Sequence, residues 1–247
     1  MSVILVTGAS RGIGAACARE LAERGNSLIL HGNRNLEAAE RLRDALPGGP
    51  HFTIAADLSD ENAAQELFER AVEEAGAVDV LVNNAGIFEE HPPHGSFEDW
   101  KRAWDETLRV NLLAPVHLMY FAARHFHERG GGRIVNVTSR GAFRGEPTAP
   151  AYGASKAGLN SAGQSMAKAL GRDGILVFTV APGWVETDMA AEALAGEAGA
   201  AAISDTAIGR VATPEEVAQV VAFLASDAPA SLTGCVIDVN GGSYLRT

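Results

Sequence analysis

A tyrosine and a lysine one helical turn apart are the residues of this chain best suited to proton chemistry. Tyr152 and Lys156 would project from one face of a helix expected over residues 150 to 171. A neighbouring cation favours the phenolate, so the pair can exchange a proton near neutral pH although a free phenol has a pKa of about 10. Ser139, at the end of an apolar run, adds a hydroxyl. The alternative is that Tyr152 packs at the helix start while Lys156 is solvated.

The elements that must position these side chains alternate along the chain. Helix-length segments, such as 15 to 24, 36 to 46 and 61 to 75, separate apolar runs of strand length. These runs are Val3 to Val6, Leu28 to Leu30, Phe52 to Ala56, Val78 to Val82, Arg133 to Val137, Leu176 to Val180 and Cys235 to Val239. Continuous Val/Ile/Leu runs are typical of strands that are buried on both faces. The sequence therefore predicts a single-domain α/β fold of the Rossmann type, a doubly wound parallel sheet of about seven strands with helices on both faces.

The charge balance excludes polyanionic partners. The chain has 20 Lys and Arg residues against 31 Asp and Glu residues, a net charge of −11, and no basic stripe at helical spacing. Neither nucleic acid nor an anionic membrane suits such a surface, so a small-molecule ligand is expected.

The cysteines and the N-terminal segment indicate the compartment. Cys17 and Cys235 lie far apart without metal-ligand spacing, so neither a metal site nor a disulfide framework is expected. The first apolar run is too short for a signal-peptide core or a membrane span, which favours a cytoplasmic location. The length suits one domain over residues 1–247.

Segment 187–206 departs from this alternation. It is rich in Ala, Gly and Glu and lacks strong turn residues, so we expect weakly anchored helix there. Loops at the carboxyl ends of the strands line the ligand crevice of an open α/β sheet. The segment is therefore a candidate substrate lid.

A glycine-rich turn follows the first strand. Glycines let the backbone turn sharply and approach a pyrophosphate, whose charge suits the N-terminus of the following helix. The spacing, Gly-x-x-x-Gly-x-Gly, differs from the general dinucleotide fingerprint, and an ordinary strand-to-helix turn is the alternative. The candidate cofactor-binding residues are Gly8, Ser10, Arg11, Gly12, Ile13 and Gly14.

The segment after the second strand indicates which dinucleotide is bound. The general fingerprint has an acidic residue there that binds the ribose 2′-hydroxyl of NAD. Here the chain reads His-Gly-Asn33-Arg34, with no carboxylate before Glu37. Arg34 and Arg11 offer planar, always charged groups that suit a 2′-phosphate. We therefore predict NADPH over NADH, the alternative being that these arginines are solvated loop residues.

Taken together, these motifs resemble those of the short-chain dehydrogenase/reductase family over nearly the whole chain. The matching motifs are Thr7-Gly8-x-x-x-Gly12-x-Gly14, Asp57-Leu58, Asn83-Asn84-Ala85-Gly86, Asn111, Ser139, Tyr152-x-x-x-Lys156, Pro182-Gly183 with Thr187, and Val239-Asn240-Gly241-Gly242. Each motif is weak alone, but together they occur in the order and spacing of the family.

The resemblance implies a role for each catalytic candidate. Tyr152 would protonate the carbonyl oxygen as hydride arrives from the nicotinamide, a step that belongs to the cofactor. Lys156 would hold the nicotinamide ribose and lower the pKa of the phenol. Ser139 would bind the substrate oxygen. Asn111 would fix a water that connects Lys156 to solvent, although a satisfied buried amide is the alternative.

The resemblance also implies further cofactor contacts. Asp57 would contact the adenine, Asn83 the adjacent ribose, and Thr187 the carboxamide. Asp57 is also a good helix cap, and Asn83 and Asn84 are also good turn residues. The remaining positions are Leu58, Ala85, Gly86, Pro182, Gly183 and Val185.

The substrate is less well defined. The overall resemblance is greatest to bacterial 3-oxoacyl-acyl-carrier-protein reductases. Gly130 and Asp173, however, stand where those enzymes often carry arginines for an acidic carrier, and the negative net charge also disfavours such a carrier. Arg140 and Arg144 offer a site for a carboxylate or phosphate, but we expect them in a solvated loop.

Three functions follow from these observations. The first is an NADPH-dependent ketoreductase acting on a 3-oxoacyl thioester or a similar ketone. The second is an NAD(P)-dependent dehydrogenase of a secondary alcohol, sugar or polyol. The third is a non-catalytic nucleotide-binding regulator, which would be expected to lack one of Ser139, Tyr152 and Lys156. The resemblance also implies a homotetramer, with a dimer as the alternative, and the apolar stretch 112 to 126 agrees with a buried interface.

Overall fold

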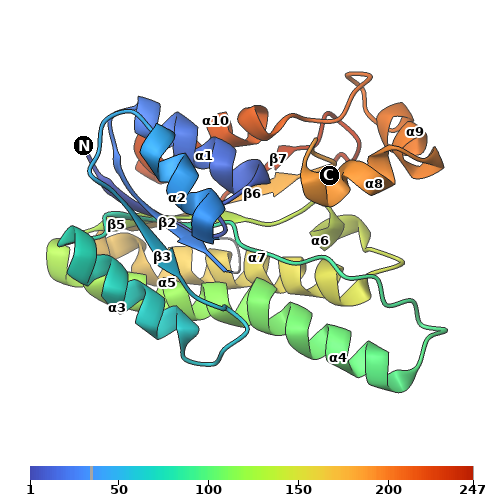
Figure 1. Cartoon of the computed structure of the whole chain (residues 1–247), viewed down its shortest axis with the longest axis horizontal. Helices are drawn as coiled ribbons and strands as arrows, with labels where there is room; N and C mark the ends of the chain where they lie inside the picture. Colours follow the sequence, from blue (N-terminus) through green and yellow to red (C-terminus); the bar gives the residue numbers. More distant parts are fainter. Residues whose placement is uncertain (34–35, 247) are drawn as a thin grey trace.

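The protein folds around one parallel sheet with strand order β3-β2-β1-β4-β5-β6-β7 (Figure 1). The computed structural model describes residues 1–33 and 36–246, with the backbone alone at 192–193 and 197–198. Its strands are β1 (Val3–Val6), β2 (Ser27–Gly32), β3 (His51–Ala55), β4 (Val80–Asn83), β5 (Gly132–Val137), β6 (Ile175–Pro182) and β7 (Val236–Val239). All seven apolar runs of the sequence are thereby confirmed as strands.

Helices connect the strands and cover both faces of the sheet. Their bounds are α1 (Gly12–Glu23), α2 (Leu36–Ala45), α3 (Ala63–Ala75), α4 (Phe97–Leu108), α5 (Ala114–Arg129), α6 (Gly141–Arg144), α7 (Pro150–Leu170), α8 (Asp188–Leu194), α9 (Glu197–Ser204) and α10 (Pro214–Ser226). Single 3-10 turns lie at Gly171–Asp173 and Ala230–Leu232. Helices α1, α2 and α10 lie on one face and α3, α5 and α7 on the other (Figure 1).

Alternating side chains of each strand point to opposite faces of the sheet and pack in two separate hydrophobic cores. In β1, Ile4 and Val6 pack toward α1 and α10, whereas Leu5 packs toward α3 and α5. All three side chains are fully buried. This two-sided burial explains why the strands appear in the sequence as unbroken apolar runs, and the doubly wound arrangement is confirmed.

Helix α7 provides the rigid support for the tyrosine and the lysine. It begins with Pro150 in its first turn, where the missing N–H costs no hydrogen bond, and Ala and Leu residues favour its long interior. A 3-10 turn follows, and Gly174, with a φ of 72°, leads the chain into β6. The helix expected over residues 150 to 171 is therefore present.

A π-helical turn at Arg109–Leu113 joins α4 to α5. Such turns hold one residue more than α-helical register allows and occur often at functional sites. Asn111 is the fully buried residue at the centre of this turn. The local irregularity therefore directs its amide inward.

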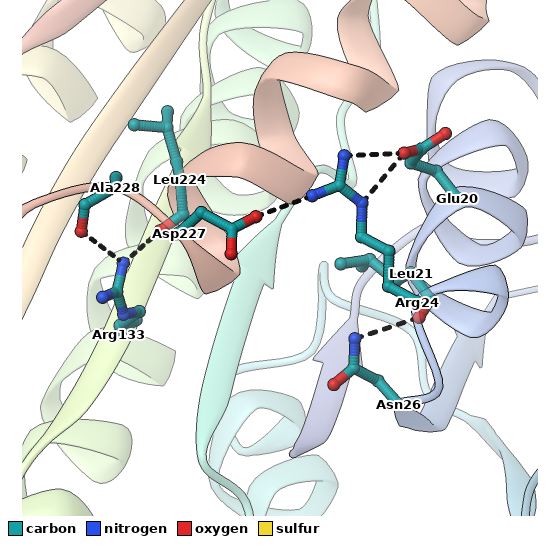
Figure 2. A network of polar contacts seen from close by, with 8 residues as sticks. All are labelled: Glu20, Leu21, Arg24, Asn26, Arg133, Leu224, Asp227 and Ala228. Carbon is teal, nitrogen blue, oxygen red and sulfur yellow. Dashed lines mark hydrogen bonds and ion pairs between the residues drawn. The ribbon is translucent and has the colours of Figure 1, made fainter. Parts of the chain in front are cut away.

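A polar network fastens α10 to the sheet at a distance from these residues (Figure 2). Arg133 of β5 donates from Nη1 to the carbonyls of Leu224 and Ala228, both at 3.0 Å. Arg24, just after α1, pairs with Asp227 at 2.8 Å. Arg133 thus satisfies carbonyls that the end of a helix leaves without an internal partner.

No helix within the described part of the chain is both long and apolar enough to span a bilayer.

Candidate active site

Ser139, Tyr152 and Lys156 meet beyond the carboxyl end of β5. The Lys156 ammonium donates to the carbonyl of Val137 at 3.1 Å and lies 5.6 Å from the centre of the Tyr152 ring. The Ser139 hydroxyl is within hydrogen-bonding reach of the phenol and accepts from the Gly141 N–H at 3.0 Å. Strand β5 and helix α7 therefore bring the three predicted side chains together, as the spacing along the helix requires.

Burial dominates the ionisation of the tyrosine and the lysine. Loss of water raises the pKa of Tyr152 to about 12, which outweighs the lowering by its Ser139 hydrogen bond, and the Glu146 carboxylate raises it further. Burial lowers the pKa of Lys156 to about 8. Burial, not the neighbouring cation that the sequence analysis emphasised, therefore has the largest effect on the pKa of the phenol. The phenol is neutral at pH 7 and therefore holds a proton that it can donate.

Asn111 anchors the segment that follows β4. Its Oδ1 accepts from the Ile87 N–H at 2.8 Å, and its Nδ2 donates to the Ile87 carbonyl at 2.9 Å. A Cβ at Gly86 would lie 3.3 Å from both Asn111 Oδ1 and Lys156 Nζ. Asn111 is thus a buried amide whose hydrogen bonds are satisfied, as in the alternative interpretation. Its Oδ1 and the Lys156 ammonium also both lie close to Gly86, so the predicted water-mediated link to Lys156 is compatible with this position.

The glycine-rich turn forms one wall of a cavity of about 520 Å³, and Tyr152 and Lys156 lie on another wall. A volume of this size is typical of small-molecule sites. The predicted residues that line the cavity are Gly8, Ser10, Arg11, Gly12, Ile13, Gly14, Asn33, Asp57, Leu58, Ala85, Gly86, Tyr152, Lys156 and Thr187. One cavity thus joins the candidate nucleotide site to the candidate catalytic site.

The glycine-rich turn fits a dinucleotide because side chains at its glycines would collide with the neighbouring backbone. A Cβ at Gly14 would collide with the Gly8 carbonyl and the Asn84 amide, and Gly8 itself has a φ of 65°. Only glycine combines that backbone conformation with such close packing. The first N–H groups of α1 remain available to an anion, as at other phosphate-binding helix starts.

The structure places the other predicted positions away from the cavity lining. Asn83 is buried, and its Nδ2 donates to Asn136 at 3.0 Å and to the Pro115 carbonyl at 3.3 Å. Pro182, Gly183 and Val185 continue β6 behind the site. Ser139 and Asn111 adjoin two residues that line the cavity, Tyr152 and Gly86 respectively. Arg34 lies outside the described residues.

The cavity lining also includes residues outside the predicted set, and two of these, His31 and Asn84, hold the glycine-rich turn in place. His31 accepts from the Gly8 N–H at 3.1 Å through Nδ1, and its Nε2 lies 3.0 Å from the Ala56 carbonyl. Asn84 donates to the carbonyls of Thr7 at 2.9 Å and Gly8 at 3.2 Å. Both brace the glycine-rich turn. For His31 the signal in the sequence was its location at the end of a strand, and Asn84 belongs to the Asn83-Asn84-Ala85-Gly86 motif.

The solvated loop expected at Arg140 is wrong. Arg140 is only 3% exposed and lies between β5 and α6, immediately before the first residue of α6. Arg144 has a side chain that is 33% exposed, and it pairs with Glu146 at 3.6 Å. Asp57, by contrast, accepts from both the N–H and the hydroxyl of Ser59, as a turn-capping carboxylate does.

No cluster of three or more His, Cys, Asp or Glu side chains suited to a metal ion occurs among the described residues.

Comparisons with known proteins agree with this architecture. A family model described as Enoyl-(Acyl carrier protein) reductase matches residues 8–244. A cis-4-hydroxycyclohexanecarboxylate dehydrogenase from Sinomonas cyclohexanicum is 38% identical over 97% of this chain and 95% of its own length. A 3-oxoacyl-[acyl-carrier-protein] reductase from Vibrio cholerae is also 38% identical, over 98% of this chain and 97% of its own.

A solved structure extends the similarity to three dimensions. The short-chain dehydrogenase from Burkholderia cenocepacia, crystallised in complex with NADP, has a TM-score of 0.88 and 36% identity. The match covers 97% of this chain and 96% of that one. The chain belongs to the short-chain dehydrogenase/reductase family and is an oxidoreductase that acts on keto or hydroxyl groups of a small molecule.

Proposed function

We propose that the protein is an NADPH-dependent ketoreductase in which Tyr152 protonates the oxygen of a ketone. One observation carries the proposal: Tyr152 and Lys156 face the same cavity as the glycine-rich turn, with Ser139 within hydrogen-bonding reach of the phenol. In this assignment, NADPH held by the turn supplies the hydride.

The side chains have separate tasks in this proposal. Ser139 donates a hydrogen bond to the substrate oxygen and orients it toward Tyr152. Tyr152, neutral because burial raises the pKa of its hydroxyl to about 12, transfers its proton to that oxygen. Lys156 is mostly cationic below its pKa of about 8 and stabilises the phenolate that remains.

The proton that Tyr152 loses must be replaced from solvent. Lys156 Nζ and Asn111 Oδ1 both lie close to Gly86, and Asn111 is fixed by its two hydrogen bonds to Ile87. We assign Asn111 the role of holding a water that connects Lys156 to solvent. The π-helical turn supports this role because it directs the amide inward.

The preference for NADPH rests on one cationic residue of the cavity lining, Arg11. Arg11 is exposed at the start of α1 and lines the cavity beside Asn33. A 2′-phosphate would gain charge-assisted hydrogen bonds there. A kcat/KM for NADH equal to or above that for NADPH would contradict the preference. Arg11→Gln should narrow the NADPH-to-NADH ratio, whereas Arg41→Gln, an exposed change on α2, should not.

A panel of substrates tests the reaction itself. NADPH oxidation is followed with an acetoacetyl thioester, a β-ketoester, a cyclic ketone and a quinone, and NADP reduction with secondary alcohols, sugars and polyols. Turnover of ketones supports the proposal. Oxidation of alcohols alone would favour the second candidate, a dehydrogenase, which the names of several relatives support. NADPH binding without any turnover would indicate the non-catalytic regulator.

We also propose one domain over residues 1–247, a cytoplasmic location and a homotetramer. Leu113 and Tyr120, on the π-helical turn and α5, are 45% and 52% exposed, as expected of apolar residues that a neighbouring subunit covers. Helices α8 and α9 lie within the expected lid, residues 187–206, where Thr187, Asp188 and Met189 line the cavity. The mass in solution tests the assembly, and a monomer or a dimer would contradict the tetramer.

A further inference from the structure

Three charged side chains lie on the segment that joins Ser139 to Tyr152. Arg140 immediately precedes α6, Arg144 is its last residue, and Glu146 follows it. We call these three residues the arginine cluster. The proposed mechanism makes no use of either arginine, although the cluster lies directly beside the catalytic serine.

Short backbone contacts fix the cluster against the site. The N–H of Gly141 donates to the Ser139 hydroxyl at 3.0 Å, and a Cβ at Gly141 would collide with the Glu146 carboxylate. On the other side, a Cβ at Gly153 would lie 3.4 Å from the Glu146 nitrogen, so the segment packs against the turn of α7 that carries Tyr152. The cluster therefore adjoins both groups that would hold the substrate oxygen.

The Arg140 guanidinium lacks a protein partner within the described chain. It is 3% exposed, and its guanidinium makes no hydrogen bond or ion pair to another described residue, although its nitrogens are not fully enclosed. Glu146 and Asp205 act on it only through longer-range attraction. Burying a cation without a partner is costly, so a nearby anion would be strongly favoured.

The remaining members of the cluster leave this positive charge largely uncompensated. Glu146 pairs with Arg144 at 3.6 Å, which balances one arginine. Asp205, at the end of α9, has a weaker influence on Arg140 than Glu146 has. The three cluster residues together carry one net positive charge, which matches a singly charged group better than a phosphate dianion near Glu146.

We infer that Arg140 binds a carboxylate of the substrate, so that the physiological substrate is an oxo acid or hydroxy acid. The inference rests on the proposed function, because it places the reacting oxygen at Ser139 and Tyr152. A guanidinium presents a planar fork to a carboxylate. The acid group would then set which end of the substrate faces Ser139.

A binding experiment tests this inference without relying on turnover. The NADPH-loaded enzyme, which cannot oxidise an alcohol, is titrated by calorimetry with 4-hydroxycyclohexanecarboxylate and with its neutral carboxamide, and likewise with 4-hydroxypentanoate and its amide. We expect each acid to bind at least about tenfold more tightly than its amide, as one charge-assisted contact allows. Equal affinities, or no binding of either acid, would overturn the inference.

Variants of the arginine cluster test whether it causes the preference for the acid over the amide. Arg140→Gln should bring each acid and its amide within about twofold, whereas Arg41→Gln, a matched loss of charge on the exposed face of α2, should leave the preference intact. Glu146→Gln removes the competing carboxylate and should tighten acid binding about threefold or more. An undiminished preference in Arg140→Gln, or weaker acid binding in Glu146→Gln, would contradict the assignment.

Two readouts separate this inference from the proposed function. Arg140→Gln should still reduce an uncharged ketone with NADPH, because Ser139 and Tyr152 remain. If no ketone is reduced by the native enzyme, the proposed function fails while the acid preference can still be measured. If ketones are reduced but acids show no advantage in binding, only the inference about Arg140 fails.

Discussion

His31 Nδ1 accepts a hydrogen bond from the Gly8 N–H at 3.1 Å, which fastens the glycine-rich turn to the end of β2. The other ring nitrogen lies 3.0 Å from the carbonyl of Ala56, just after β3. The imidazole must be neutral for this arrangement, because only a neutral ring offers an acceptor. Its burial lowers its pKa, which keeps it neutral.

Loss of the imidazole should loosen the glycine-rich turn. We expect His31→Ala to raise the KM for NADPH about tenfold, because the Gly8 N–H loses a buried acceptor, and to change kcat far less. Steady-state kinetics with NADPH varied at saturating ketone measures both constants. His51→Ala, on the edge strand β3, is the control and should change neither. A lower kcat with an unchanged KM for NADPH would contradict the positioning role of His31.

Replacing the tyrosine by phenylalanine should abolish turnover and spare cofactor binding. Tyr152→Phe removes the proton donor, and a general acid contributes about 10²- to 10⁴-fold to a rate. We expect kcat to fall by that factor while the Kd for NADPH, measured by fluorescence titration, stays within a few-fold. Tyr120→Phe, an exposed change on α5, serves as the control. Near-normal kcat in Tyr152→Phe would show that another group is the acid.

Ketone reduction should decline at alkaline pH. Burial lowers the pKa of Lys156 to about 8, whereas that of Tyr152 is about 12. As the pH rises through 8, the lysine loses the charge that stabilises the phenolate while the tyrosine still holds its proton. We therefore expect kcat/KM for the ketone to be level below pH 8 and to fall above it. A profile that rises across this range would contradict the assigned ionisations.

The buried lysine should also cost stability. Its folded pKa of about 8 lies below the unfolded value of about 10.4, so the unfolded state binds more protons between these limits and stability rises with pH there. At pH 7 the cost approaches about 3 kcal/mol. We expect Lys156→Met to raise the free energy of unfolding by about 1 to 3 kcal/mol at pH 7 while abolishing activity. Chemical denaturation of both proteins at pH 7 and pH 10 measures the gain in stability and its decrease at the higher pH, and a less stable variant at pH 7 would refute the argument.

The two arginines of the network in Figure 2 should differ in their effect on stability. Arg133→Met leaves two carbonyls at the end of α10 without their donor, which should cost about 2 to 3 kcal/mol. Arg24→Met breaks a more exposed pair with Asp227 and should cost less than about 1 kcal/mol. Urea unfolding of both variants, with activity as a check on the site, measures the difference. Equal losses would mean that Arg133 contributes no more than a surface ion pair.

The sequence predicted those features that depend on local periodicity. The strands were recognisable because burial on both faces leaves unbroken apolar runs, and β1 shows this with Ile4, Leu5 and Val6. Tyr152 and Lys156 were recognisable because their separation equals one turn of α7. Both features depend only on the periodicity of one strand or one helix, which can be read directly from the sequence.

Features that depend on how loops pack were not predictable. Asn83 and Asn84 are adjacent, and alternation along a strand requires that they face opposite sides, but only the packing of α5 shows that Asn83 turns away from the cavity. Arg140 was expected in solvent, because a charged residue in a loop gives no sign in the sequence that packing buries it. His31 was missed because its partners, Gly8 and Ala56, come from two other strand ends.

The π-helical turn Arg109–Leu113 fixes how many residues are needed between α4 and α5. An unbroken α-helix from Phe97 to Arg129 would need one residue fewer to keep its outer face in the same orientation. Deleting one residue of this turn would therefore restore an unbroken α-helix with α4 and α5 in register, but Asn111 would lose the widened turn that directs its amide inward. Helix length and site geometry are thus coupled here, and single-residue deletions should be tolerated far less in this turn than in the exposed loop that precedes α4.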